Sequence, residues 1–186
     1  MGFFASQFVS YAMIAWLPTV LTQLGMPLEA GIRAGIVYNA CAVVGALLVG
    51  PTIARVGSRW TILAVAVLAA VAVTAAPMVV GPGRSAVPVL VAIGLGGFSI
   101  GMAIAALYAV TPQAYPATIR ATGLGFAVTW GRIAGITTTL VGGVVLTLAA
   151  GNAVPFFGML LVACALVFVA AVVLQRHIPA RSAGVR

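Results

Sequence analysis

Apolar residues fill six long stretches of this chain, and short breaks separate one stretch from the next. The stretches cover residues 3–24, 30–54, 61–80, 87–110, 121–149 and 155–174. The breaks are rich in Arg, Pro and Gly, which mark turns and loops. A bilayer core about 30 Å thick takes roughly 20 apolar residues of helix. Each stretch therefore predicts one membrane-spanning helix.

The composition leads to the same fold class. Of 186 residues, 63% are hydrophobic and 5% are charged. That leaves too few polar side chains to cover the surface of a water-soluble protein, so the apolar surface of this chain must face the lipid bilayer. We expect an all-α integral membrane protein. Residues 1–180 form its six-helix transmembrane domain, and residues 181–186 form a short cytoplasmic tail.

The charge of the chain is carried almost entirely by arginine. Nine residues are Arg, none is Lys, the single acid is Glu29, and the formal net charge is +8. No basic stripe with interleaved aromatic residues is present, so nucleic acid is not an expected partner. With an even number of spans, both termini lie on one face. Two arginines, Arg33 and Arg84, fall on the opposite face, and six fall on the face of the termini: Arg55, Arg59, Arg120, Arg176, Arg181 and Arg186.

This asymmetry predicts the orientation of the protein. Short loops with an excess of Arg face the cytoplasm. We expect a multi-pass protein of the cell inner membrane with both termini in the cytoplasm.

Enzymatic chemistry has little support in the sequence. No predicted span contains Asp or Glu, and the one histidine, His177, follows the last span. The two cysteines, Cys41 and Cys164, lie within apolar stretches. Paired carboxylates, metal clusters and a base for a nucleophile are therefore missing. The sequence predicts a protein that is not an enzyme and has no metal and no cofactor.

One charge lies inside a predicted span. Arg132 comes twelve residues after Arg120, which places it roughly 18 Å along the helix at 1.5 Å per residue. Arginine at this depth is costly unless it faces a polar cavity or a partner. A guanidinium group there suits a carboxylate, which it holds through two charge-assisted hydrogen bonds. The alternatives are an acid on another polypeptide and the carbonyl groups of a helix end.

The neighbours of Arg132 favour a cavity. Steps of three or four residues along the helix reach Thr129 and Gly125 in one direction, and Gly135, Thr139 and Gly142 in the other. One face of this helix is therefore small and polar.

Polar residues inside the first two spans are milder candidates for substrate contact. Gln7 and Tyr11 share a helical face, and Tyr38 and Asn39 lie in the middle of the second span. Hydrogen bonds between helices would explain them equally well. In the fourth span Gly97 and Gly101 stand four residues apart, a spacing that lets two helix backbones approach closely.

Residues 50–59 resemble the cytoplasmic loop motif of the major facilitator superfamily, G-x-x-x-D-R-x-G-R-[RK]. The matching positions are Gly50, Arg55, Gly57 and Arg59. Ala54 stands where the motif has Asp, and Ser58 stands where it has Arg. The charge relay that the motif supports in the family is therefore incomplete here.

A second segment carries a more specific resemblance. Residues 115–125, which include Arg120, and residues 131–135, which include Arg132, are similar to the signature Y-P-T-x-x-R-A-T-G-x-G…G-R-x-G. That signature marks helix 11 of the aromatic acid:proton symporters, and it resembles the same helix in organic ion and sugar porters. Gln113 replaces an acid that related sugar porters often carry, which weakens the sugar interpretation.

The resemblance implies a fold and a function. The chain corresponds to helices 7 to 12, one half of a major facilitator fold, and Arg132 faces an organic anion that resembles an aromatic acid. An N-terminal six-helix half or a second copy would complete the carrier. Proton coupling needs a group that titrates near neutral pH, which arginine does not, so we expect no coupled transport by this chain alone. The alternatives are half of a sugar, metabolite or drug efflux porter, and a truncated fragment that does not transport.

Overall fold

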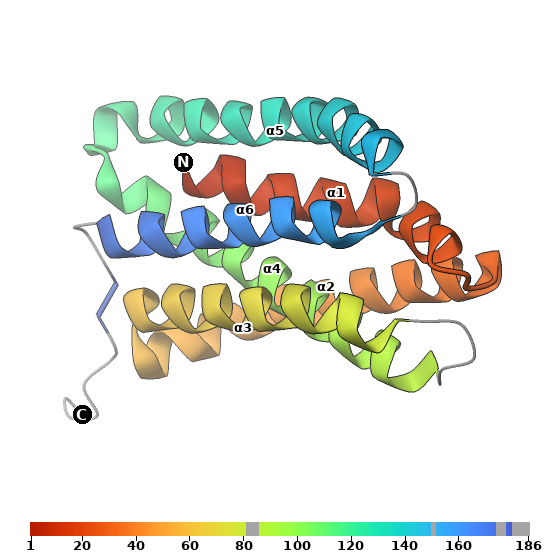
Figure 1. Cartoon of the computed structure of the whole chain (residues 1–186). Helices are drawn as coiled ribbons and strands as arrows, with labels where there is room; N and C mark the ends of the chain where they lie inside the picture. The colour runs from red at the N-terminus through yellow and green to blue at the C-terminus, as the bar shows by residue number, and fades with distance from the viewer. Residues whose placement is uncertain (81–85, 150–151, 174–177, 180–186) are drawn as a thin grey trace.

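In the part of the chain that the structure describes, six long α-helices form a bundle (Figure 1). The computed structural model describes residues 1–80, 86–149, 152–173 and 178–179. Its helices are α1 (Gly2–Gln23), α2 (Leu28–Val56), α3 (Ser58–Val79), α4 (Ala86–Val110), α5 (Arg120–Leu148) and α6 (Val154–Val173). Each expected span holds one helix, and all six are long and apolar enough to cross a membrane. The prediction of an all-α membrane fold is confirmed.

The connection between α2 and α3 is shorter than the sequence indicated. Residues 55–60 form a break between two apolar stretches of the sequence, but in the structure Gly57 alone separates the two helices. Its φ of 88° lies in the left-handed region that glycine adopts without strain. Thr61 then donates its backbone N–H and its hydroxyl to the Gly57 carbonyl, which begins α3 directly. One glycine thus reverses the chain direction.

Two short 3₁₀ helices, η1 (Thr111–Ala114) and η2 (Ala117–Ile119), join α4 to α5. Both contain or follow a proline that cannot continue the preceding helix. The loop expected at residues 81–85, the turn at residues 150–151 and the tail at residues 181–186 lie outside the described residues.

The helices run lengthwise beside one another, and α5 forms one edge of the bundle (Figure 1). α5 packs mainly on α1, and α4 packs on α2 and α3. α3 also contacts α6, and α1 lies against α2 and α6. α4 is the most buried span, whereas α2 and α5 are the least buried. Much of the surface of α2 and α5 is therefore open to whatever surrounds the bundle.

The core lies between α1, α3, α4 and α6. Its largest buried apolar side chains are at most 2% exposed and include Val9, Leu17, Ile62, Val89 and Phe156. Phe156 and Phe157 pack edge to face, with ring centroids 5.7 Å apart. The bundle holds together by this packing and by close helix contacts, because lipid supplies little hydrophobic drive for helices to associate.

Candidate functional site

The contact between α1 and α5 positions most of the predicted site residues. Two glycines of α5 face two polar side chains of α1. A Cβ atom at Gly131 would lie 2.9 Å from Cγ of Gln7, and one at Gly135 would lie 2.9 Å from Cδ2 of Tyr11. Both distances are below a normal carbon–carbon contact. The missing side chains of these glycines are what let Gln7 and Tyr11 lie flat on α5.

Arg132 stands beside this contact with its side chain exposed. Its Nη1–H donates a hydrogen bond of 2.7 Å to the hydroxyl oxygen of Tyr11. Within the described part of the chain this is its one side-chain partner. Glu29, the sole acid of the sequence, instead lies 3.5 Å from Arg33 on the exposed surface of α2. The guanidinium group of Arg132 therefore keeps four of its five N–H donors for another group.

Threonines extend the polar surface around Arg132. Thr129 and Thr139 are exposed, and each donates its hydroxyl to a carbonyl of its own helix, that of Gly125 and that of Gly135. Their oxygen atoms can still accept a hydrogen bond from a ligand. The predicted small polar face is thus partly open. Gly135 lies under Tyr11, and Gly142 lies under the indole of Trp16.

The two candidates on α2 are separated by the structure. Tyr38 is 2% exposed, and its hydroxyl oxygen makes no hydrogen bond with any described residue, although Ser10 is the polar group that faces it. Asn39 is exposed, and its Nδ2 donates to the Gly35 carbonyl at 2.9 Å. Adjacent residues of a helix differ by about 100° in direction, so one points into the core and the other points out.

The cytoplasmic loop motif lies at the junction of α2 and α3, and most of it is exposed. The exposed members are Gly50, Arg55, Arg59 and, at the start of α5, Arg120. Ser58, which departs from the motif, is fully buried. Its backbone N–H donates to the carbonyl of Ile178 at 2.9 Å, and its hydroxyl accepts from the Ile178 N–H at 2.8 Å. Where the family motif has an arginine, this chain has a serine that holds the segment following α6.

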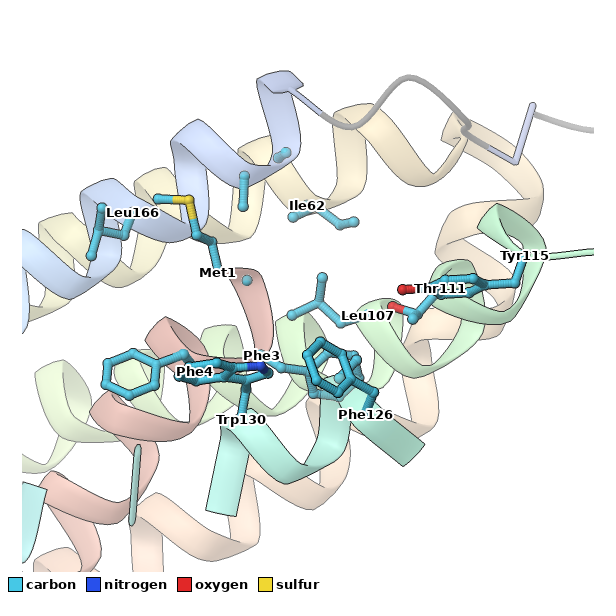
Figure 2. A pocket seen from close by; sticks show the side chains of 14 residues that line it. Met1, Phe3, Phe4, Ile62, Leu107, Thr111, Tyr115, Phe126, Trp130 and Leu166 are labelled. Atoms are coloured by element: carbon cyan, nitrogen blue, oxygen red, sulfur yellow. The ribbon is translucent and has the colours of Figure 1, made fainter. Parts of the chain in front are cut away.

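A pocket of about 540 Å³ opens near the start of α1, a feature that the sequence did not suggest (Figure 2). Aromatic rings gather around it, and Thr111 and Tyr115 bring hydroxyl groups. The rings belong to Phe3, Phe4, Tyr115, Phe126 and Trp130. Trp130 and Arg132 are two positions apart on α5, about 200° around the helix. The pocket and the guanidinium group therefore lie on different sides of α5.

The described residues contain no group of three His, Cys, Asp or Glu side chains that could bind a metal. What they do contain is a six-span helical bundle with an exposed cation, Arg132, in the middle of α5. This combination defines a class of multi-pass membrane protein with an exposed polar surface on one of its spans.

The chain belongs to the major facilitator superfamily, whose family model matches residues 1–185. A gallate transporter of Pseudomonas putida is 29% identical over 157 residues, which cover 80% of this chain and 32% of that protein. NiaP of Bacillus subtilis (strain 168), assigned as a niacin/nicotinamide transporter, is 30% identical over 72% of this chain and 32% of its own length. The chain spans about a third of the length of these curated relatives. Family and relatives are those of a transporter, not of an enzyme.

Proposed function

We propose that the chain is the C-terminal half of a secondary transporter for a small aromatic carboxylate, and that Arg132 binds the carboxylate. The observation that carries this proposal is an exposed arginine within a span that has no acid beside it. A bidentate ligand with a single negative charge would complement the donors that Tyr11 leaves available. Gallate and niacin, which appear in the names of two relatives, are both aromatic acids, and the name of the second relative also includes the uncharged amide nicotinamide.

The proposed binding surface has its centre on α1 and α5. Arg132 supplies the charge, and Gln7, Tyr11 and Thr129 surround it. Asn39 would supply a second wall from α2. Tyr38, which is buried, would reach a ligand only after the core opens.

A second six-helix unit is the proposed partner, either an N-terminal half or another copy of this chain. The exposed faces of α2 and α5 support this proposal, because they present large apolar side chains such as Leu47 and Ile136, 73% and 66% exposed. The helix 11 signature on α5 supports the assignment to the C-terminal half. The count of arginines supports cytoplasmic termini and a place in the cell inner membrane.

Proton coupling, as in the symporters that the chain resembles, would have to use a titratable group outside this surface. Arginine stays protonated at every physiological pH. We therefore expect a proton gradient to drive uptake only when a partner unit supplies an acid or a histidine.

Uptake in proteoliposomes tests the role of Arg132. The chain would be reconstituted with an N-terminal six-helix half, such as that of the Pseudomonas putida gallate transporter, and labelled gallate uptake would be measured. Arg132→Lys keeps the charge but loses the planar fork, so uptake should fall by at least about tenfold. Arg33→Lys, on an exposed pair with Glu29, is the matched control and should leave uptake unchanged.

Equal uptake by Arg132→Lys and the wild type would refute the bidentate role. Uptake of gallate by neither would favour the alternatives, namely a porter for another metabolite or a fragment that does not transport.

A further inference from the structure

We propose that Tyr11 is a positioning residue for Arg132. In this proposal Tyr11 fixes the plane of the guanidinium group and so sets the preference of the site for a carboxylate over an uncharged amide of the same shape. The inference rests on the proposed function, because it needs Arg132 to bind the carboxylate. It adds a specific source of selectivity, which lies on a different helix from the charge.

The packing of the Tyr11 ring on α5 is the first observation that supports this proposal. Its ring lies over Gly135, where a Cβ atom would come 2.9 Å from Cδ2 and 3.0 Å from Cε2. Gly131 gives the same space to Gln7 one helical turn earlier on α1. Behind them, the Thr138 hydroxyl donates to the Phe8 carbonyl at 3.1 Å in a fully buried contact. The ring of Tyr11 is therefore held by α5 itself, next to the residue that it orients.

The hydrogen bond is the second observation. An exposed arginine side chain has several rotatable bonds and loses rotamer entropy when it is fixed. The Tyr11 oxygen accepts from Nη1 at 2.7 Å, which fixes one corner of the planar guanidinium group. The Nε–H and Nη2–H edge then points in a defined direction. A ligand that binds this edge finds a pair of donors that is already ordered in the unbound protein. Binding therefore loses less conformational entropy.

Selectivity follows from the geometry of two parallel donors. A carboxylate offers two equivalent oxygen acceptors that match the fork. A carboxamide of the same shape offers one oxygen and one NH₂ group, so a donor would face a donor. The penalty applies only while the fork is held in place, because a mobile guanidinium group can turn to make a single hydrogen bond with either ligand.

Binding to the chain reconstituted with the same N-terminal six-helix half, in lipid nanodiscs, tests the inference. The probes are labelled gallate and, as competitor, its isosteric amide 3,4,5-trihydroxybenzamide. Tyr11→Phe keeps the ring on Gly135 and removes the hydroxyl group. It should weaken gallate binding by about tenfold, the size of one hydrogen bond to a charged group. Amide binding should become stronger, because the freed guanidinium group can turn to donate to the amide oxygen. Tyr108→Phe is the matched control. It alters a tyrosine that packs edge to face on Phe3 and should change neither affinity.

A double-mutant cycle with Arg132→Gln distinguishes positioning from direct contact. If Tyr11 acts through Arg132, Tyr11→Phe should have no further effect on gallate binding once Arg132→Gln is present. An equal loss in both backgrounds, or an equal loss for acid and amide, would overturn the inference. A third result would also overturn it: Arg132→Gln abolishes gallate binding, but Tyr11→Phe alone leaves gallate binding unchanged. In that case the proposed function stands. If Arg132→Gln leaves gallate binding intact, or the wild type binds none, the proposed function itself fails.

Discussion

Two helix pairs of this bundle are built on glycines, but the glycines face different groups. In the α2–α4 pair a Cβ atom at Gly97 would overlap the carbonyl oxygen of Tyr38, and one at Gly101 would overlap that of Ala42. The same holds in reverse for Gly45 of α2 against the Phe98 carbonyl. In the α1–α5 pair the glycines face side chains instead, those of Gln7 and Tyr11. The α2–α4 contact, or backbone joint, therefore brings one backbone against another. The α1–α5 joint instead places side chains of α1 in a groove of α5.

The difference bears on what each joint can do. A backbone joint has no side-chain torsion through which to relax, so we expect α2 and α4 to behave as one rigid unit. In the α1–α5 joint the groups in contact are side chains with rotatable bonds, and one of them bonds Arg132. We infer that the bundle places its candidate ligand surface on the joint that can adjust. The following substitutions test this contrast, from the largest expected effect to the smallest.

Gly97→Ala should have the largest effect. The new Cβ meets a carbonyl oxygen that cannot turn away, so the two helices must separate and lose contacts along their length. We expect a loss of about 3 kcal/mol in the free energy of unfolding, the upper range for overpacking. Denaturation in mixed detergent and sodium dodecyl sulfate micelles measures it.

Gly96→Ala is the control for this substitution, because its Cβ would lie 3.8 Å from that of Ala72, an ordinary contact. It should be neutral or slightly stabilising, since alanine favours a helix over glycine by about 1 kcal/mol. Similar losses at positions 96 and 97 would mean that the backbone joint is not what makes Gly97 special.

Gly135→Ala should cost less, about 1–2 kcal/mol, because the ring of Tyr11 can swing away. It should also change function, since the moved ring can no longer accept the hydrogen bond from Arg132. Gallate binding in nanodiscs should weaken as it does in Tyr11→Phe. Gly125→Ala on the same helix meets nothing within 4 Å and should leave both stability and binding as they are. If Gly135→Ala lost more stability than Gly97→Ala, the contrast between the two joints would be reversed.

The sequence predicts one of these joints better than the other. Gly97 and Gly101, four residues apart in an apolar span, indicate a close approach of backbones, and the structure confirms it. The spacing does not name the partner helix, because any span can offer a flat backbone. On α5 the sequence marked Gly135 and Gly142 as part of an open polar face. Tyr11 and Trp16 of α1 cover them, which only the pairing of helices reveals.

Burial within a span is the other feature that the sequence leaves undetermined. Tyr38 and Asn39 look alike as polar residues in the middle of α2, yet the first is buried and the second is exposed. In a soluble helix the apolar stripe would mark the inner face, but in a membrane both faces of a helix are apolar. The contact of Ser58 with Ile178 is harder still to predict from the sequence, because it joins residues 120 positions apart. The spans follow from local composition, and the contacts follow from packing.

Thr138→Val should have the smallest effect of the series. Its hydroxyl donates to the Phe8 carbonyl and is the polar bond between α1 and α5 at their buried contact. Hydrogen bonds between helices in a membrane contribute about 0.6 kcal/mol on average, because the separated helices also find partners for these groups. Valine has nearly the same shape, so the steric fit of the joint is preserved, and we expect a loss of about that size in the same micelle assay.

Thr137→Val is the comparison for Thr138, because the Thr137 hydroxyl bonds the Ile133 carbonyl of its own helix and its loss should not weaken the contact with α1. The pair of variants separates two accounts of the α1–α5 joint. If glycine grooves hold the helices together, Thr138→Val stays well below Gly135→Ala in its effect. If the two losses are equal, the buried hydrogen bond is a main contact of the joint. In that case the seat of Tyr11 depends on a bond that fixes the spacing of the helices, and the joint is as rigid as the one between α2 and α4.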